Sequence, residues 1–140
     1  MINAYVFAPV AVDAGASVPF AASRAQTWSG CRCNGGWLPP SDGSAQFLLS
    51  RPGIYMVSVG AQVTSAVAGD VATLAITTNC EALAGTTMAE TITAAGDVSQ
   101  LATTALLTVP CGASITVALT NTGDADITVN AARFVLTRVA

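Results

Sequence analysis

The sequence predicts one all-β domain, an antiparallel sandwich of two sheets or a jelly roll. Apolar residues recur at every second position through most of the 140-residue chain, which is typical of strands that bury one face. Turn residues separate these runs at short, regular intervals, as in sandwiches and barrels. Val and Thr suit a pleated sheet, and together with Gly they interrupt the Ala-rich stretches too densely for helices.

About eight or nine short strands are expected. The clearest is Ile54–Thr64, whose core-facing residues should be Tyr55, Val57, Val59, Ala61 and Val63. Its other face should carry Ser58, Gly60, Gln62 and Thr64. The same alternation assigns further residues to the core: Ala72, Leu74, Ile76, Ile115, Val117, Leu119, Ala132, Phe134 and Leu136. It assigns others to the opposite face: Thr73, Ala75, Thr77, Arg133 and Val135. Further strands are expected at about Ala4–Val10, Gln46–Ser50 and Leu101–Val109.

Tight turns are expected where Gly, Pro and Asp cluster. Gly adopts positive φ and Asp can bond to its own backbone, so both suit connections between antiparallel strands. The predicted corners are Arg51-Pro52-Gly53, Ala68-Gly69-Asp70, Ala95-Gly96-Asp97, Pro110-Cys111-Gly112 and Thr122-Gly123-Asp124.

One region departs from this pattern. Residues 21–44 contain both tryptophans, two cysteines, a Gly-Gly pair and a Pro-Pro pair. We interpret them as a long irregular excursion, with at most one short strand, within a single domain that spans residues 1–140. Long loops on a rigid sandwich often carry function.

The charge content argues against several classes of protein. Only 9% of residues are charged, lysine is absent and the net charge is −3, so no basic patch for nucleic acid or an anionic membrane is expected. No apolar run reaches the roughly 18 residues that a membrane helix needs. The apolar start has no Lys or Arg before it and is broken by Pro9 and Asp13, which predicts a chain without a signal peptide.

No catalytic centre is predicted. Histidine and lysine are both absent, so Ser29, Cys31 and Cys33 lack the usual bases that activate a nucleophile. The only glutamates, Glu81 and Glu90, lie in or beside a turn-rich stretch, and no phosphate-binding loop is present.

The cysteines do not predict a metal site. They stand at positions 31, 33, 80 and 111, and the single Cys-x-Cys pair has no histidine partner for zinc. Free thiols, or bridges formed late in an oxidising environment, are the alternatives. Two bridges among four cysteines would allow three connectivities.

The order of motifs along nearly the whole chain resembles a known family. Four segments show the resemblance: Phe47–Val57 (apolar strand, Arg-Pro-Gly-Ile-Tyr, apolar strand), Leu74–Asn79, Val109–Asn121 and Ala132–Val139. They are similar to the complement-globular-head and tumour-necrosis-factor-like jelly rolls, and closest to the bacterial and bacteriophage members. Two turns depart from the family pattern, because Asn79-Cys80 stands where Asn-Gly is common and Cys111-Gly112 where Gly-Asp is common.

The resemblance implies a homotrimer whose inner sheets pack around a three-fold axis. That sheet would hold the N-terminal strand and the strands at Ile54, Leu101–Val109 and the C-terminus, with Tyr55 and Phe134 pointing into the core. The interface residues would be Met56, Ser58, Gln62, Arg133 and Val135. Arg133 would then need a carboxylate, a carbonyl or a wet channel. Independently, a monomer with so few charges would expose much neutral surface, which an obligate interface would bury.

The resemblance also implies a disulfide candidate. In the family topology the strand that ends at Asn79 lies antiparallel beside the strand that starts at Ser114. Cys80 and Cys111 would then be neighbours at one end of one sheet, within reach of a bridge.

Two functions follow as hypotheses. The first is a non-enzymatic, adhesive virion protein of a bacteriophage, such as a head fibre, decoration or tail-tip trimer, whose partners are other virion or surface-coat proteins. The alternative is a sugar- or protein-binding complement-type head on a bacterial surface or coat, which would recognise a host-surface glycan or protein. Both place the chain on a virion or an extracellular surface.

The binding hypothesis rests on five residues: Trp28, Trp37, Asp70, Asp97 and Asp124. The family topology implies that the three aspartate loops gather at one end, where a trimer would bring nine carboxylates together, with Asp126 close by, and could hold Ca²⁺. Alternatively, the aspartates are simple turn residues and the tryptophans plug the open end of the sandwich. No other cofactor is expected.

Overall fold

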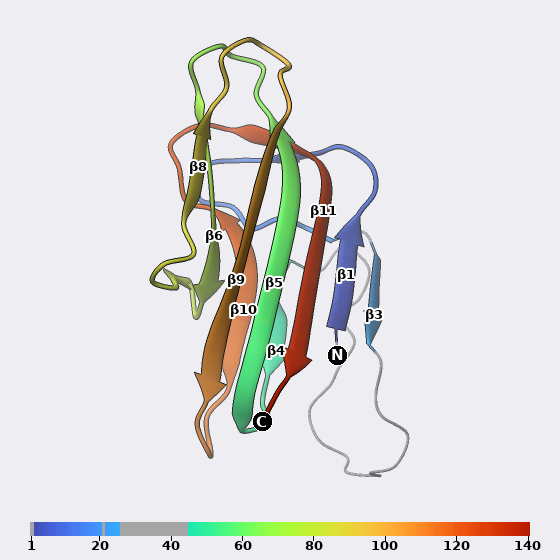
Figure 1. The fold of residues 1–140 in the computed structure, drawn as a ribbon, viewed down its shortest axis with the longest axis vertical. Helices are drawn as coiled ribbons and strands as arrows, with labels where there is room; N and C mark the ends of the chain where they lie inside the picture. The colour runs from blue at the N-terminus through green and yellow to red at the C-terminus, as the bar shows by residue number, and fades with distance from the viewer. Residues whose placement is uncertain (1, 21, 26–44) are drawn as a thin grey trace.

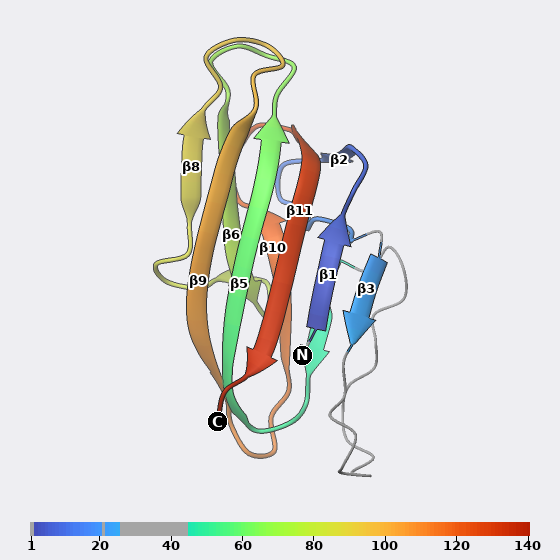
Figure 2. The same cartoon turned by 45° about the vertical axis from the view of Figure 1, so that its right-hand side comes forward.

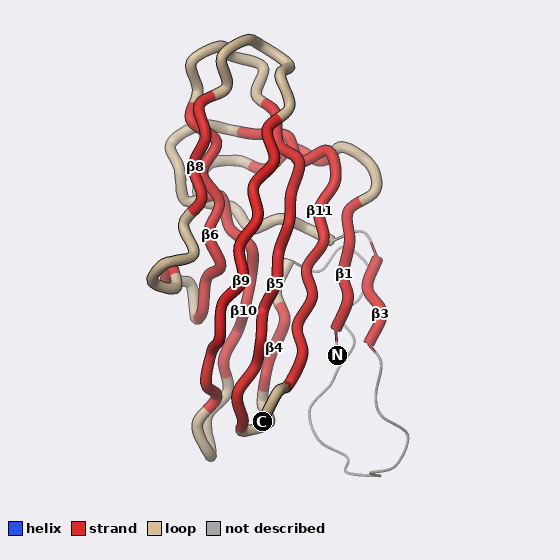
Figure 3. Tube along the Cα trace, in the orientation of Figure 1, coloured by secondary structure: helices blue, strands red, loops and turns tan. Residues whose placement is uncertain are grey.

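Two antiparallel sheets face each other across one apolar core (Figure 1), as the alternation predicts. The fold is seen in a computed structural model that describes residues 2–20, 22–25 and 45–140. Every described element is a strand, turn or loop, with no helix in these ranges (Figure 3). The strands number eleven among the described residues, more than expected, because several contain only two to four residues.

The larger sheet has the order β3-β1-β11-β5-β9, and β2 pairs with one end of β11 (Figure 2). Its strands are β1 (Ile2–Val6), β2 (Val10–Val12), β3 (Ala22–Ala25), β5 (Gly53–Thr64), β9 (Ser99–Val109) and β11 (Ile127–Arg138). The four segments that the family resemblance assigned to one sheet therefore do share it. Its centre is the pairing of β5 with β9 and β11 along nearly their whole length.

The smaller sheet has the order β4-β10-β6-β7, and β8 pairs with the start of β6. Its strands are β4 (Phe47–Leu49), β6 (Val71–Thr78), β7 (Glu81–Ala82), β8 (Met88–Thr91) and β10 (Ile115–Asn121). From β8 onward every connection crosses from one sheet to the other, so the turns at residues 92–98, 110–114 and 122–126 close the two ends of the sandwich.

The N-terminal strand differs from the prediction of one strand at Ala4–Val10. It begins at Ile2 and stops at Val6, and β2 resumes at Val10. Both pieces pair with β11, where the register shifts between Val129 and Ala131. Pro9 lacks the N–H that a continuous strand would need, so the chain leaves the sheet and re-enters it beyond this irregularity.

The core joins the two sheets through aromatic rings. Phe47 on β4 and Phe134 on β11 stack with their ring centroids 4.8 Å apart, and Phe20 packs 5.7 Å from each. Tyr55 is also fully buried and donates a hydrogen bond from its hydroxyl to the carbonyl of Arg51. Burial raises the pKa of this phenol above its ordinary value, although the charges of Arg138 and Arg51 act in the opposite direction.

The smaller sheet corrects one part of the predicted alternation. Ala75 and Thr77 were expected on an open face, but both are buried. Thr77 shares a hydrogen bond with Thr120, and Thr120 shares another with Ser17, in a segment that runs beside β10. The segment around Ser17 covers this face of the smaller sheet, where the side chains are small and the hydroxyl groups pair with one another. Alternation along one strand does not indicate that a distant segment covers its second face.

The turn between β6 and β7 contains a strained cysteine. Asn79 and Cys80 both have positive φ, 50° and 68°, in a two-residue loop between the paired residues Thr78 and Glu81. This is the pattern of a type I′ turn, which favours Asn-Gly. A side chain other than glycine costs free energy in this left-handed conformation, and Asn tolerates it better than Cys does.

Replacing this cysteine by glycine should therefore stabilise the fold. We expect Cys80→Gly to raise the free energy of unfolding by about 1 kcal/mol, measured by urea denaturation. Cys111→Gly is the matched control, because Cys111 is also an exposed free thiol but has no positive φ. Equal effects of the two substitutions would contradict the explanation.

Candidate functional site: the outer face of the larger sheet

Strands β1, β11, β5 and β9 lie side by side in the larger sheet (Figure 2), and we call the surface that their outward residues form the outer face. Strand pairing places its residues in rows across the sheet. One row runs Asn3, Val135, Ser58 and Thr104, and the next runs Tyr5, Arg133, Gly60 and Ala102. On either side lie the rows Thr137, Met56 and Leu106, and Ala131, Gln62 and Gln100.

All five residues predicted for an interface lie on this outer face. Ser58 is paired with Val135, and Gly60 is paired with Arg133. Met56 and Gln62 stand two residues from Ser58 and Gly60, respectively, on the same side of β5. The structure therefore brings the set together, and Tyr55 and Phe134 point the other way into the core, as expected. Whether the face contacts another copy stays a prediction.

Two exposed apolar residues on the outer face were not singled out from the sequence. Leu106 is 64% exposed, and Ile54 is also exposed. Leu106 pairs with Met56, so the apolar side chains adjoin one another. Because Leu106 and Leu107 are adjacent and both apolar, the sequence alone does not indicate which of them faces the core. The register with β5 places Leu106 opposite Met56 on the outer face and leaves Leu107 buried.

The outer face carries almost no charge. No carboxylate occurs in β1, β5, β9 or β11. Arg133 is the one charged residue in the four rows described above; it is exposed, and within residues 2–20 and 45–140 it forms no ion pair. The aspartates and glutamates of the described ranges all lie in loops or on the smaller sheet.

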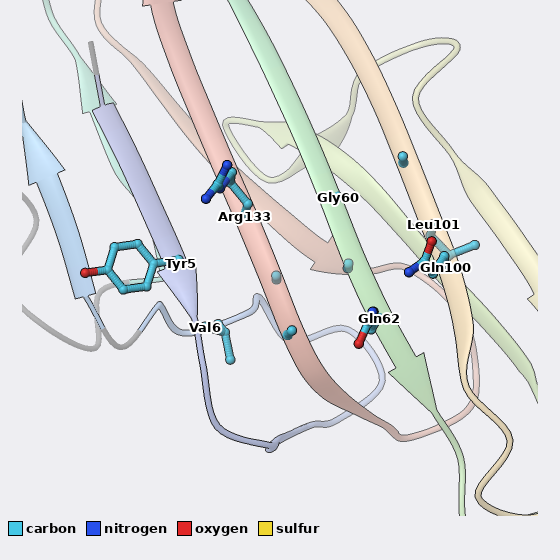
Figure 4. A pocket seen from close by; sticks show the side chains of 11 residues that line it. Tyr5, Val6, Gly60, Gln62, Gln100, Leu101 and Arg133 are labelled. Carbon is cyan, nitrogen blue, oxygen red and sulfur yellow. The ribbon is translucent and has the colours of Figure 1, made fainter.

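A depression of about 430 Å³ lies on the outer face around Gly60 (Figure 4). Small residues line it where three strands meet: Gly60 on β5, Ala102 on β9 and Ala131 on β11. Longer polar side chains also line it: Tyr5, Arg133, Gln62 and Gln100. Figure 4 shows Gly60 between Tyr5 and Arg133 on one side and Gln100 on the other.

The predicted aspartate cluster is only partly assembled. Backbone hydrogen bonds join the loops of Asp70 and Asp97, from Gly69 N–H to the Ile92 carbonyl and from Gly96 N–H to the Ser65 carbonyl. The loop of Asp124 instead bonds to β6, through the Thr122 N–H and the Thr73 carbonyl.

Asp70 and Asp97 each accept a hydrogen bond within their own loop, and Asp126 accepts one from the N-terminal segment. Asp70 accepts a 2.6 Å hydrogen bond from the buried Ser65, Asp97 accepts one from Thr93, and Asp126 accepts one from the Ala14 N–H. Asp124 is exposed. In the described part of the chain, no group of three or more acidic or cysteine side chains is arranged to hold a metal ion.

The cysteine prediction is settled only in its strand pairing. β6 lies antiparallel beside β10, as the resemblance implies, and the Asn79 side-chain carbonyl accepts a hydrogen bond from the Thr116 N–H. Cys80 and Cys111 follow β6 and precede β10, respectively, but both are exposed free thiols, not a disulfide. These two cysteines therefore form no covalent link between β6 and β10 in this structure.

The tryptophan site lies outside the described residues. Trp28 and Trp37 fall within residues 26–44, together with Ser29, Cys31 and Cys33. Their predicted roles in binding stay predictions.

Comparison with known proteins adds no assignment: the chain matches no protein-family model and no curated protein. None of the described segments is a helix long and apolar enough to cross a membrane.

Proposed function

We propose that this protein is a non-enzymatic structural module that forms homotrimers through its outer face, on a bacteriophage virion or another extracellular surface. In that setting it would serve as a head fibre, decoration or tail-tip component with an adhesive role. Its partners would be copies of itself and neighbouring virion or surface-coat proteins.

The neutral outer face is the observation that carries this proposal. The three long strands and β1 span on the order of 600 Å², given strands about 4.8 Å apart with a rise of about 3.3 Å per residue. Each partner in a standard interface buries roughly 800 Å² of accessible surface, which is the same order of magnitude as the projected area of the outer face. Exposed Ile54, Met56 and Leu106 supply apolar area that monomeric proteins usually keep small.

Charge also favours contact between copies. The chain has a net charge of −3, so identical subunits repel one another wherever carboxylates face each other. The strands that build the outer face lack carboxylates, so association there avoids this repulsion. The absence of lysine and the presence of only five arginines leave few sites for trypsin-like proteases, which suits a particle surface.

Two matched substitutions test the proposal. Leu106→Glu on the outer face should convert trimers into folded monomers, because an interface would have to bury one new carboxylate from each copy. Leu48→Glu is the control, because Leu48 lies on β4 of the smaller sheet and is 54% exposed, against 64% for Leu106. Light scattering after size exclusion gives both masses, and circular dichroism checks the fold. A trimeric Leu106→Glu protein would contradict the proposal.

A further inference from the structure

Gly60 leaves a gap in the outer face that the backbone does not require. It lies in the middle of the twelve-residue strand β5, and its φ is outside the left-handed region. A Cβ atom added to it would meet nothing within 4 Å. Glycine inside a strand costs about 0.5–1 kcal/mol relative to alanine, and it often marks a close approach by another group.

The residues around Gly60 define what could enter the depression. Ala102 and Arg133 are its direct partners on the neighbouring strands, so residues of β5, β9 and β11 line the depression together. Tyr5 and Arg133 line the side toward β1. An aromatic ring entering there would lie beside the exposed guanidinium of Arg133, and a cation can sit favourably against a ring face.

The chain itself supplies an aromatic ring on the same side. Phe7 directly follows β1 and is 71% exposed, the largest value among the exposed large apolar side chains of the described residues. Its ring lies 6.2 Å from that of Tyr5. Because β1 lies two strands away from β5 in the sheet, the backbone of Phe7 is displaced about 10 Å sideways from that of Gly60, measured across the strands.

We infer that Phe7 of one copy inserts into the Gly60 depression of the next copy. The inference rests on the proposed trimer and names its central contact. The ring and the depression are different parts of one face, so the contact is head-to-tail and can close into a ring of three. It also gives Arg133, whose charge is otherwise unpaired within the described ranges, a partner in the assembly.

A second copy suits this depression better than an acidic partner or a free ligand. The depression is surrounded by uncharged sheet that continues to the exposed Met56 and Leu106, so an occupant that fills the gap and also covers this sheet buries more surface than a free ligand in the gap alone. Another copy brings both the ring and a carboxylate-free sheet of matching size.

Two substitutions test the contact from its two sides. Gly60→Val fills the depression, and Phe7→Ser removes the ring. Each should raise the trimer dissociation constant about tenfold or more, measured by sedimentation equilibrium. The double variant should be little weaker than either single variant, because both remove one contact. Gly60→Val should not lower the melting temperature of the monomer, because a β-branched residue suits a strand and meets no clash.

Controls and outcomes separate this inference from the proposed function. Val67→Ser removes an exposed apolar side chain outside the outer face and should leave the trimer intact. A trimeric wild type whose affinity is unchanged by Gly60→Val would overturn the inference and leave the proposed function standing. A monomeric wild type would overturn both. Extra mass on each subunit in native mass spectrometry, lost in Gly60→Val, would show that a ligand fills the depression and would also overturn the inference.

Discussion

Replacing Phe134 by alanine is expected to destabilise the subunit by about 3–5 kcal/mol, the cost typical of removing a buried aromatic ring. Phe134 is fully buried on β11 and stacks on Phe47 from the opposite sheet. Phe20 meets it edge-on, with 5.7 Å between ring centroids. The substitution would therefore leave a cavity where the two sheets join, with two rings that lose their packing partner.

Urea denaturation at one fixed protein concentration measures this effect, because assembly makes apparent stability depend on concentration. Phe134→Leu is the conservative control and should cost clearly less, because leucine refills part of the volume. A loss below about 1 kcal/mol for Phe134→Ala would mean that this ring cluster does not hold the sandwich together.

Replacing Asn121 by aspartate is expected to cost about 3 kcal/mol or more at neutral pH. The Asn121 amide is fully buried at the end of β10. Its nitrogen donates hydrogen bonds to the carbonyls of Val12 and Ala125, at 3.3 and 2.8 Å, and its oxygen accepts one from the Gly123 N–H. Aspartate keeps the shape but replaces both donors with a carboxylate oxygen that faces two carbonyl oxygens.

The pH dependence makes this prediction specific. A protonated carboxyl can donate one of the two lost hydrogen bonds, so the deficit of Asn121→Asp relative to wild type should shrink as the pH is lowered from 7 to 4. Asn130→Asp is the control, because Asn130 is only half-buried on β11. A deficit that does not change with pH, or one equal to that of Asn130→Asp, would contradict the role assigned to the amide.

The long strands could be predicted from the sequence because burial on one face imposes a period of two. Tyr55 to Val63 and Ala132 to Leu136 are buried at every second position, with Val135 and Arg133 outside, as predicted. The corners at Gly69, Gly96 and Gly112 were also predicted, because these glycines supply positive φ. Local chemistry decides both features, so no partner strand needs to be known.

Features that depend on long-range pairing were missed or only partly predicted. The break after Val6, at Pro9, lies beside β11 where its pairing with β5 shifts register, more than a hundred residues away in the chain. The burial of Thr77 depends on Ser17 and Thr120, which pattern alone cannot bring together. The depression at Gly60 needs Ala102 and Ala131 beside it, and only the register of three strands places them there.

Sedimentation equilibrium of the wild-type protein over a range of concentrations tests the central claim most directly. A subunit has a mass of 14.0 kDa, so the trimer should weigh three times this value, about 42 kDa. We expect this mass to persist on dilution into the micromolar range. A single species of 14.0 kDa at every concentration would mean that the outer face meets only solvent, and would contradict the account.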